Sequence, residues 1–261
     1  MVGAESPLAG RRVLVTRPAG RGESLALRLR QIGAEVETRP TIALEPPSDT
    51  EAARRAVRQL KDYDWLVFTS PAGVRFFLAL HRELHGGGTR IPVSIGSIGP
   101  ATARELEREG HPVGVVAEDS RSEGLARALE GHIASGQRVL VVRPEVARPV
   151  LVRALEALGA RPDPVGFYRN VPAPGLGSVV RDVCDDRFDV VLFSSPSTLE
   201  RLFQTEVAPR SELLAALGRS RLVAIGPVTA RAIEVAGLKA AGVAIEPTDE
   251  SIVQCIESCF R

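Results

Sequence analysis

The feature that most constrains the fold of this chain is an internal repeat. Three sequence blocks occur twice along its 261 residues, separated by nearly the same shift. Arg12–Pro18 recurs as Arg138–Pro144 with six of seven residues identical. The other two matches pair Asp64–Pro71 with Asp189–Pro196, and Ile98–Arg104 with Ile225–Arg231. We interpret the chain as a duplication of a domain-sized unit of about 125 residues.

Each repeat alternates segments typical of strands and of helices. Short β-branched runs resemble buried strands of parallel sheets; they are Val13–Thr16, Trp65–Phe68, Val113–Ala117, Val139–Val142, Val190–Phe193, Leu222–Ile225 and, more weakly, Ile91–Ile95. Ser24–Ile32 and its copy Val150–Leu158 carry apolar residues at helical spacing. We expect glycines to cap helices at Gly33, Gly110, Gly159 and Gly237. This alternation predicts two similar α/β lobes with parallel sheets.

Two proline-punctuated segments interrupt the alternation, Val36–Pro47 and Pro162–Pro174. Prolines confine extended chain to sheet edges and linkers. Because the two segments follow corresponding helices, we expect them to be paired connectors between the lobes.

Composition narrows the class of protein. Lys and Arg total 33 against 32 for Asp and Glu, which argues against a nucleic-acid partner. We find no run of about 18 apolar residues and no export signal, so we expect neither a membrane partner nor secretion. Three cysteines favour the reducing cytoplasm over a disulfide framework. Cys255 and Cys259 are four apart but lack a third ligand nearby, so we interpret them as small buried residues and expect no metal.

Candidate ligand-binding turns follow the predicted strands. In open α/β sheets, ligands bind at the carboxyl ends of strands, where helix N-termini present unpaired amides. The repeated blocks place small residues there, namely Thr69, Ser70, Gly99 and Thr102 and their counterparts Ser194, Ser195, Gly226 and Thr229. Such turns either cap helices or hold carboxylates and phosphates.

Two arginines and one tyrosine stand out beside these turns. Arg17 and Arg143 end the two copies of the first strand, where each guanidinium could bind a substrate carboxylate or pair with a neighbouring acid. Tyr168 lies in the second proline-rich segment. It either packs its ring on a linker strand or supplies a hydroxyl to a site.

Three other segments resemble known metal-binding or nucleotide-binding motifs but do not match them. In His81–His85 the glutamate comes one place too late for a zinc-protease helix, and we interpret the segment as a solvated helix end. Gly20–Gly22 is too short for a dinucleotide fingerprint, and Gly86–Gly88 does not follow a strand. The sequence therefore predicts no cofactor.

The order of the motifs resembles the uroporphyrinogen-III synthase family. A strand ending in Arg-Pro is followed by Asp-x3-Phe-Thr/Ser-Ser-Pro, by Ile-Gly-x-x-Thr-Ala, by Ser122–Leu125, and then by a second round. The irregular approach Ile95–Gly99 departs from the pattern. The resemblance covers the chain from about Leu14 onward.

That resemblance implies two α/β lobes joined by a two-stranded connector, with an active-site cleft between them. It implies lobes that are discontinuous in sequence, with residues 1–37 and 172–261 in the first, 43–163 in the second, and 38–42 and 164–171 as connector strands. Each lobe would then take its opening strand from the opposite repeat.

The resemblance also implies a reaction. The linear tetrapyrrole hydroxymethylbilane would lose hydroxide, ring D would be inverted through a spiro intermediate, and uroporphyrinogen III would close with net loss of one water, without cofactor or metal. Tyr168 matches the family's cleft tyrosine and would help hydroxide to leave. The family implies a cytoplasmic monomer, open to transient contact with the preceding pathway enzyme. The alternatives are a tetrapyrrole-sensing module of the same fold and a two-lobe solute-binding protein, the latter disfavoured by the missing export signal.

Overall fold

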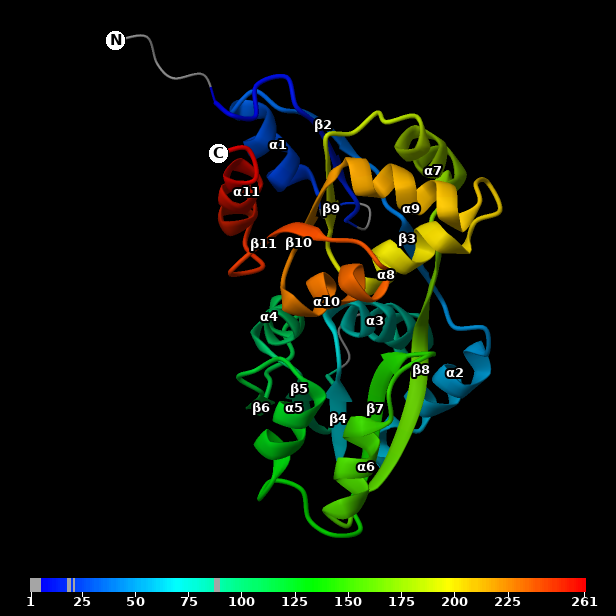
Figure 1. Ribbon diagram of the computed structural model, residues 1–261. Helices are drawn as coiled ribbons and strands as arrows, with labels where there is room; N and C mark the ends of the chain where they lie inside the picture. Colours follow the sequence, from blue (N-terminus) through cyan, green and yellow to red (C-terminus); the bar gives the residue numbers. More distant parts are fainter. Residues whose placement is uncertain (1–5, 18–19, 21, 87–89) are drawn as a thin grey trace. The chain divides into compact units, whose positions relative to one another are not determined.

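The computed structural model describes residues 6–17, 20, 22–86 and 90–261. Contacts within the chain divide it into two compact units, Met1–Ala43 with Val171–Arg261, and Leu44–Asn170. Figure 1 shows the division by colour, since the first unit joins the blue start of the chain to its yellow and red end.

The first unit holds a five-stranded sheet in the order β11-β10-β9-β1-β2, with every pair parallel. Its strands are β1 (Arg12–Val15), β2 (Glu35–Thr38), β9 (Val190–Phe193), β10 (Arg221–Ala224) and β11 (Ala240–Val243). Its helices are α1 (Glu23–Gln31), α7 (Leu176–Cys184), α8 (Pro196–Glu200), the 3-10 turn η2 (Arg201–Gln204), α9 (Arg210–Arg219), α10 (Pro227–Val235) and α11 (Asp249–Ser258).

The second unit holds a six-stranded sheet in the order β3-β8-β7-β4-β5-β6. Its strands are β3 (Ile42–Glu45), β4 (Trp65–Phe68), β5 (Ser94–Ser97), β6 (Val115–Val116), β7 (Arg138–Pro144) and β8 (Arg161–Pro172). Its helices are α2 (Thr50–Arg58), the 3-10 turn η1 (Leu60–Asp62), α3 (Pro71–His85), α4 (Pro100–Arg108), α5 (Ser122–Leu129) and α6 (Val150–Ala157).

Both sheets are buried on two faces. In β1, Leu14 packs into a cluster with α7, α9 and α10, whereas Val13 and Val15 pack with α1 and α11. In β4, Leu66 and Phe68 share a cluster with α2 and α3. Trp65 and Val67 point to the opposite face and pack with α5 and α6. Side chains alternate across a strand, so continuous apolar runs are what a doubly covered parallel sheet requires. The predicted parallel α/β fold is confirmed.

The pairing of strands crosses the two repeats. β1, which opens the first repeat, pairs with β9 of the second, and β7 of the second repeat pairs with β4 of the first. The four glycines expected to cap helices all have left-handed φ angles between +79° and +92°. Among the described residues, no helix is both long enough and apolar enough to cross a membrane.

The proline-rich segments are more regular than predicted. Glu35–Thr38 is an ordinary parallel strand beside β1, and β3 is the edge strand of the second sheet, next to β8. Pro162 and Pro164 lie within β8, opposite Val139 and Val141 of β7. β8 has twelve residues and β3 only four, so β3 covers only part of the other side of β8 and leaves positions there where a proline costs no ladder hydrogen bond.

Five of the seven predicted strands differ in their bounds, and one strand was missed. β1 lies one residue earlier than predicted, and β7 extends beyond both of its predicted ends. β5 begins after Pro92, at Ser94, and includes the Gly96 that had suggested an irregular backbone. β6 is only two residues long, and β10 ends one residue earlier than predicted. β11 (Ala-Ala-Gly-Val) gave no signal because alanine and glycine have weak strand preference.

Candidate functional site

The second unit gathers several predicted residues at the carboxyl edge of its sheet. Thr69 and Ser70 follow β4, and Arg143 lies near the end of β7, the strand that pairs with β4. Thr69 is bound to this neighbour, since its backbone amide and its hydroxyl both donate to the carbonyl oxygen of Val142, at 3.2 and 2.9 Å. Parallel pairing therefore brings residues more than 70 positions apart to one edge.

Ser70 and Tyr168 are joined by a hydrogen bond. Ser70 Oγ lies 2.9 Å from Tyr168 Oη and also accepts the amide of Gly73 at 3.0 Å, so it caps α3. The Tyr168 ring stacks on Phe76 with centroids 5.7 Å apart, and the residue is 6% exposed. Burial raises the pKa of Tyr168 above its ordinary value. The phenol is therefore protonated at neutral pH and available as a hydrogen-bond donor.

A bulge in β8 sets the position of Tyr168. Arg143 lies opposite Gly166, yet the next residue, Pro144, lies opposite Tyr168, so one extra residue is inserted in β8. Gly166 is needed at this place, because a Cβ there would lie 2.9 Å from the Cα of Glu145. The bulge aligns the tyrosine with the strand end that carries Arg143.

Arg143 has an unsatisfied donor. Its Nη1 makes only a long contact of 3.5 Å with the carbonyl of Ala147. Its Nε is buried and has no hydrogen-bond partner among the described residues. A buried guanidinium nitrogen without an acceptor is costly, and an incoming carboxylate would satisfy it.

The next turn along this edge follows β5. Gly99 precedes α4 with extended backbone, and a Cβ there would lie 2.1 Å from the Oγ of Ser120. Glycine is thus required by the close approach of the loop after β6. Thr102 lies in the first turn of α4 and is 1% exposed.

The first unit carries the duplicate turns with different detail. Ser195 caps α8. Its Oγ accepts the amide of Thr198, and its own amide donates to Thr198 Oγ1, both at 3.3 Å, so this turn caps a helix as the first of the two interpretations predicted. Ser194 precedes it and is half-buried. Gly226 precedes α10 with nothing within 4 Å of a Cβ built on it, whereas Thr229 is buried at 3% exposure.

Arg17 is paired with an acid. Its Nη1 lies 2.6 Å from Asp249 Oδ1 at the start of α11, with both side chains largely buried. The Asp249 carboxylate therefore holds the Arg17 guanidinium at the strand end. Pro18, the other residue of that motif, lies outside the described residues, as do Arg21 and Gly87–Thr89 in the glycine motifs.

The histidine segment at the end of α3 needs a correction. His81 is 4% exposed, not solvated, because it stacks on Phe77 at 5.8 Å and lies 4.9 Å from His85. Burial lowers the pKa of His81, with help from neighbouring cations. Within the part of the chain that the structure describes, no three His, Cys, Asp or Glu residues could jointly hold a metal ion.

The Ser70–Tyr168 bond and the spare donor on Arg143 could not be predicted from the sequence. Both depend on which strands are neighbours, and no local pattern encodes that. Gly166 could have predicted the bulge from the sequence, because a glycine inside a strand often marks a bulge or a close approach of another backbone segment.

Comparisons with known proteins agree with one another. The family described as "Uroporphyrinogen-III synthase HemD" matches residues 23–254. A Methanothermobacter thermautotrophicus protein, provisionally named as a uroporphyrinogen-III synthase, is 35% identical over 87% of this chain and 90% of its own. The uroporphyrinogen-III synthase of Synechococcus elongatus is 28% identical over 77% of this chain and 76% of its own.

Solved structures share the fold. A mutant uroporphyrinogen III synthase from Thermus thermophilus superposes with a TM-score of 0.67 at 24% identity, covering 96% of this chain and 98% of its own. The Helicobacter pylori uroporphyrinogen-III synthetase gives 0.59 at 14% identity, covering 95% and 99%. The profile match spans most of the chain and the relatives align along most of their length, so this chain belongs to the uroporphyrinogen-III synthase family.

Proposed function

We propose that this chain cyclises hydroxymethylbilane to uroporphyrinogen III, with inversion of ring D and loss of water. Family membership supports the reaction. One observation supports the assignment to particular residues. Tyr168 is buried and protonated, and it is hydrogen-bonded to Ser70 at the carboxyl edge of the sheet, where Arg143 also lies.

Tyr168 is the proton donor in this proposal. Hydroxide is a poor leaving group, and a donor placed beside the hydroxymethyl carbon lowers the barrier to its departure. A carboxylic acid would be ionised at neutral pH, whereas a tyrosine with a raised pKa keeps its proton. Because Ser70 Oγ is held by the Gly73 amide, the Ser70–Tyr168 bond fixes the direction of the phenol.

In this proposal the other site residues bind the carboxylates of the substrate. The substrate carries eight carboxylates, so several weak contacts can replace one strong one. The spare Nε of Arg143 suits one carboxylate. We assign supporting roles to Thr69, Gly99 and Thr102 in the second unit, and to Arg17, Ser194, Ser195, Gly226 and Thr229 in the first. The burial of Thr102 and Thr229 favours backbone amides over their hydroxyls.

The reaction eliminates water without a change of oxidation state, so the proposed chemistry needs proton transfer and positioning alone. We expect a cytoplasmic monomer.

The deciding experiment supplies hydroxymethylbilane to the purified chain and separates the uroporphyrinogen isomers. An enzyme gives isomer III faster than the spontaneous closure to isomer I. A tetrapyrrole sensor would bind the bilane or its product, yet leave isomer I dominant.

A further inference from the structure

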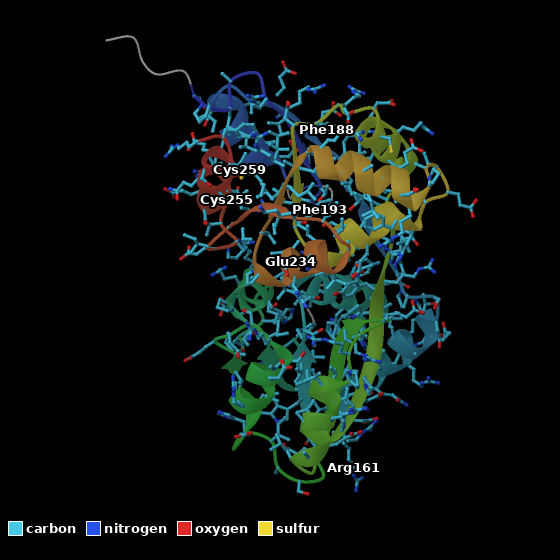
Figure 2. The ribbon with its side chains drawn as sticks, in the orientation of Figure 1. Arg161, Phe188, Phe193, Glu234, Cys255 and Cys259 are labelled. Atoms are coloured by element: carbon cyan, nitrogen blue, oxygen red, sulfur yellow. The ribbon has the colours of Figure 1, made fainter. Side chains whose placement is uncertain are left out.

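Two thiols lie at the carboxyl end of α11. Cys255 is in the last turns of the helix, and Cys259 is the residue that ends it, four positions later. Figure 2 labels both on the red helix α11. Residues four apart share one face of a helix. Both residues are half-buried, not fully buried as the sequence suggested.

The two sulfur atoms converge on one point. A Cβ built on Gly242 of β11 would lie 2.7 Å from Cys255 Sγ and 2.9 Å from Cys259 Sγ, so the sulfurs are at most about 5.6 Å apart. Glycine at 242 leaves the space that both sulfurs use. As a neutral thiol, Cys259 donates to the Cys255 carbonyl at 3.2 Å.

A cation lies beside the two thiols. Arg221 is held in place because its Nε donates to the Cys259 carbonyl at 2.9 Å and its guanidinium lies 4.1 Å from the Phe260 ring centre. The fixed Arg221 cation would offset the net negative charge of two thiolates around one monovalent ion.

We propose that Cys255 and Cys259 form a two-thiolate site for a soft monovalent cation, Cu(I). Thiolates select soft ions such as Cu(I) and Zn²⁺, but structural zinc requires four protein ligands. No His, Cys, Asp or Glu in the described part of the chain joins the two thiols to make even a three-ligand group. A linear site with metal–sulfur bonds near the zinc value of roughly 2.3 Å spaces its sulfurs by about 4.6 Å, within the limit set at Gly242.

The stoichiometry balances without oxidation. Cu(I) joins the two thiols, two Cu–S bonds form, and both S–H protons are released to solvent. A disulfide fits this geometry less well. Cβ atoms four apart on a helix are about 5–6 Å apart, whereas a disulfide needs about 3.5–4.5 Å.

The test titrates the whole protein with Cu(I) in competition with bicinchoninate, without oxygen. We expect one equivalent bound by the wild type and by Cys184→Ser, whose thiol is elsewhere in the same unit. Cys255→Ser and Cys259→Ser should each bind at least tenfold more weakly. Gly242→Ala should also weaken binding, because the added methyl would occupy the space between the sulfurs. Circular dichroism checks that each variant is folded.

Alkylation gives a second measurement that does not depend on the variants. Cu(I) should protect Cys255 and Cys259 from iodoacetamide and leave Cys184 reactive, as read by peptide mass. Full binding by the Cys255→Ser/Cys259→Ser double variant, protection of Cys184, or formation of a 255–259 disulfide without Cu(I) binding would overturn the proposal.

Discussion

Replacing Tyr168 with phenylalanine separates a catalytic hydroxyl from a packing ring. The substitution keeps the stack on Phe76 and removes the bond to Ser70, which still accepts the Gly73 amide. Loss of one neutral hydrogen bond costs about 0.5–1.5 kcal/mol of folding free energy. If the phenol assists hydroxide departure, the rate falls by about 10–1000-fold, which corresponds to about 1.4–4 kcal/mol of barrier.

Tyr63 offers a matched control in the same unit. It is 5% exposed, and its hydroxyl donates to the Asp163 carboxylate. Burial, followed by that bond, raises the pKa of Tyr63. Because its partner is charged, Tyr63→Phe should cost more stability than Tyr168→Phe, about 1.5–3 kcal/mol. We expect it nevertheless to keep the wild-type rate and isomer ratio.

The assay measures isomers III and I from hydroxymethylbilane, together with urea unfolding of each variant. We expect stability and activity to rank the two variants in opposite order. Tyr63→Phe should be the less stable variant but active, and Tyr168→Phe the more stable variant but slow, with a larger share of isomer I. Wild-type rate and isomer ratio in Tyr168→Phe would show that the ring only packs. Equal slowing by both variants would show that activity follows stability.

Four further outcomes are expected. Ser195→Ala should slow turnover about tenfold or less and lower stability by about 0.5–2 kcal/mol in urea unfolding, because it removes the cap of α8. Arg143→Met should raise KM for the bilane more than it lowers kcat, as steady-state kinetics would show. Wild-type stability should fall as pH drops below about 6.5, because the pKa of buried His81 is lower in the folded chain than in the unfolded one; His81→Leu should flatten that fall in urea midpoints against pH. Alkylation of Cys259 should have its pH midpoint near 7, well below that of Cys184, whose pKa burial raises.

The sequence predicted most of the secondary structure because both sheets are covered on two faces. Such strands must be apolar throughout, which is why Trp65–Phe68 and Val190–Phe193 were predicted to the residue. Helix starts were equally clear, since all four repeated prolines occupy a first turn. β11 and the regularity of β8 were not predictable, because weak or proline-containing strands form through their neighbours.

The candidate site was predicted as a set of positions, but not as a set of contacts. Ser70 and Tyr168 are 98 residues apart, and their bond depends on β8 and β4 both lying beside β7. Spacing along the chain assigns a residue to a strand end. It does not determine which strand ends meet.

The two strand-end arginines have the same position in the two repeats but different hydrogen-bond partners. Arg17 and Arg143 occupy equivalent positions in the repeats, yet Arg17 is bound to Asp249, whereas Arg143 Nε has no hydrogen-bond partner among the residues that the structure describes. At the shift of 127 that relates Ile98 to Ile225, Asp249 aligns with Ser122. Because the strand exchange places Arg17 in the unit that carries Asp249 and Arg143 in the unit that carries Ser122, only one arginine has an acid at this position. The free donor at the carboxyl edge thus follows from one aspartate-to-serine difference combined with the exchange of strands between repeats.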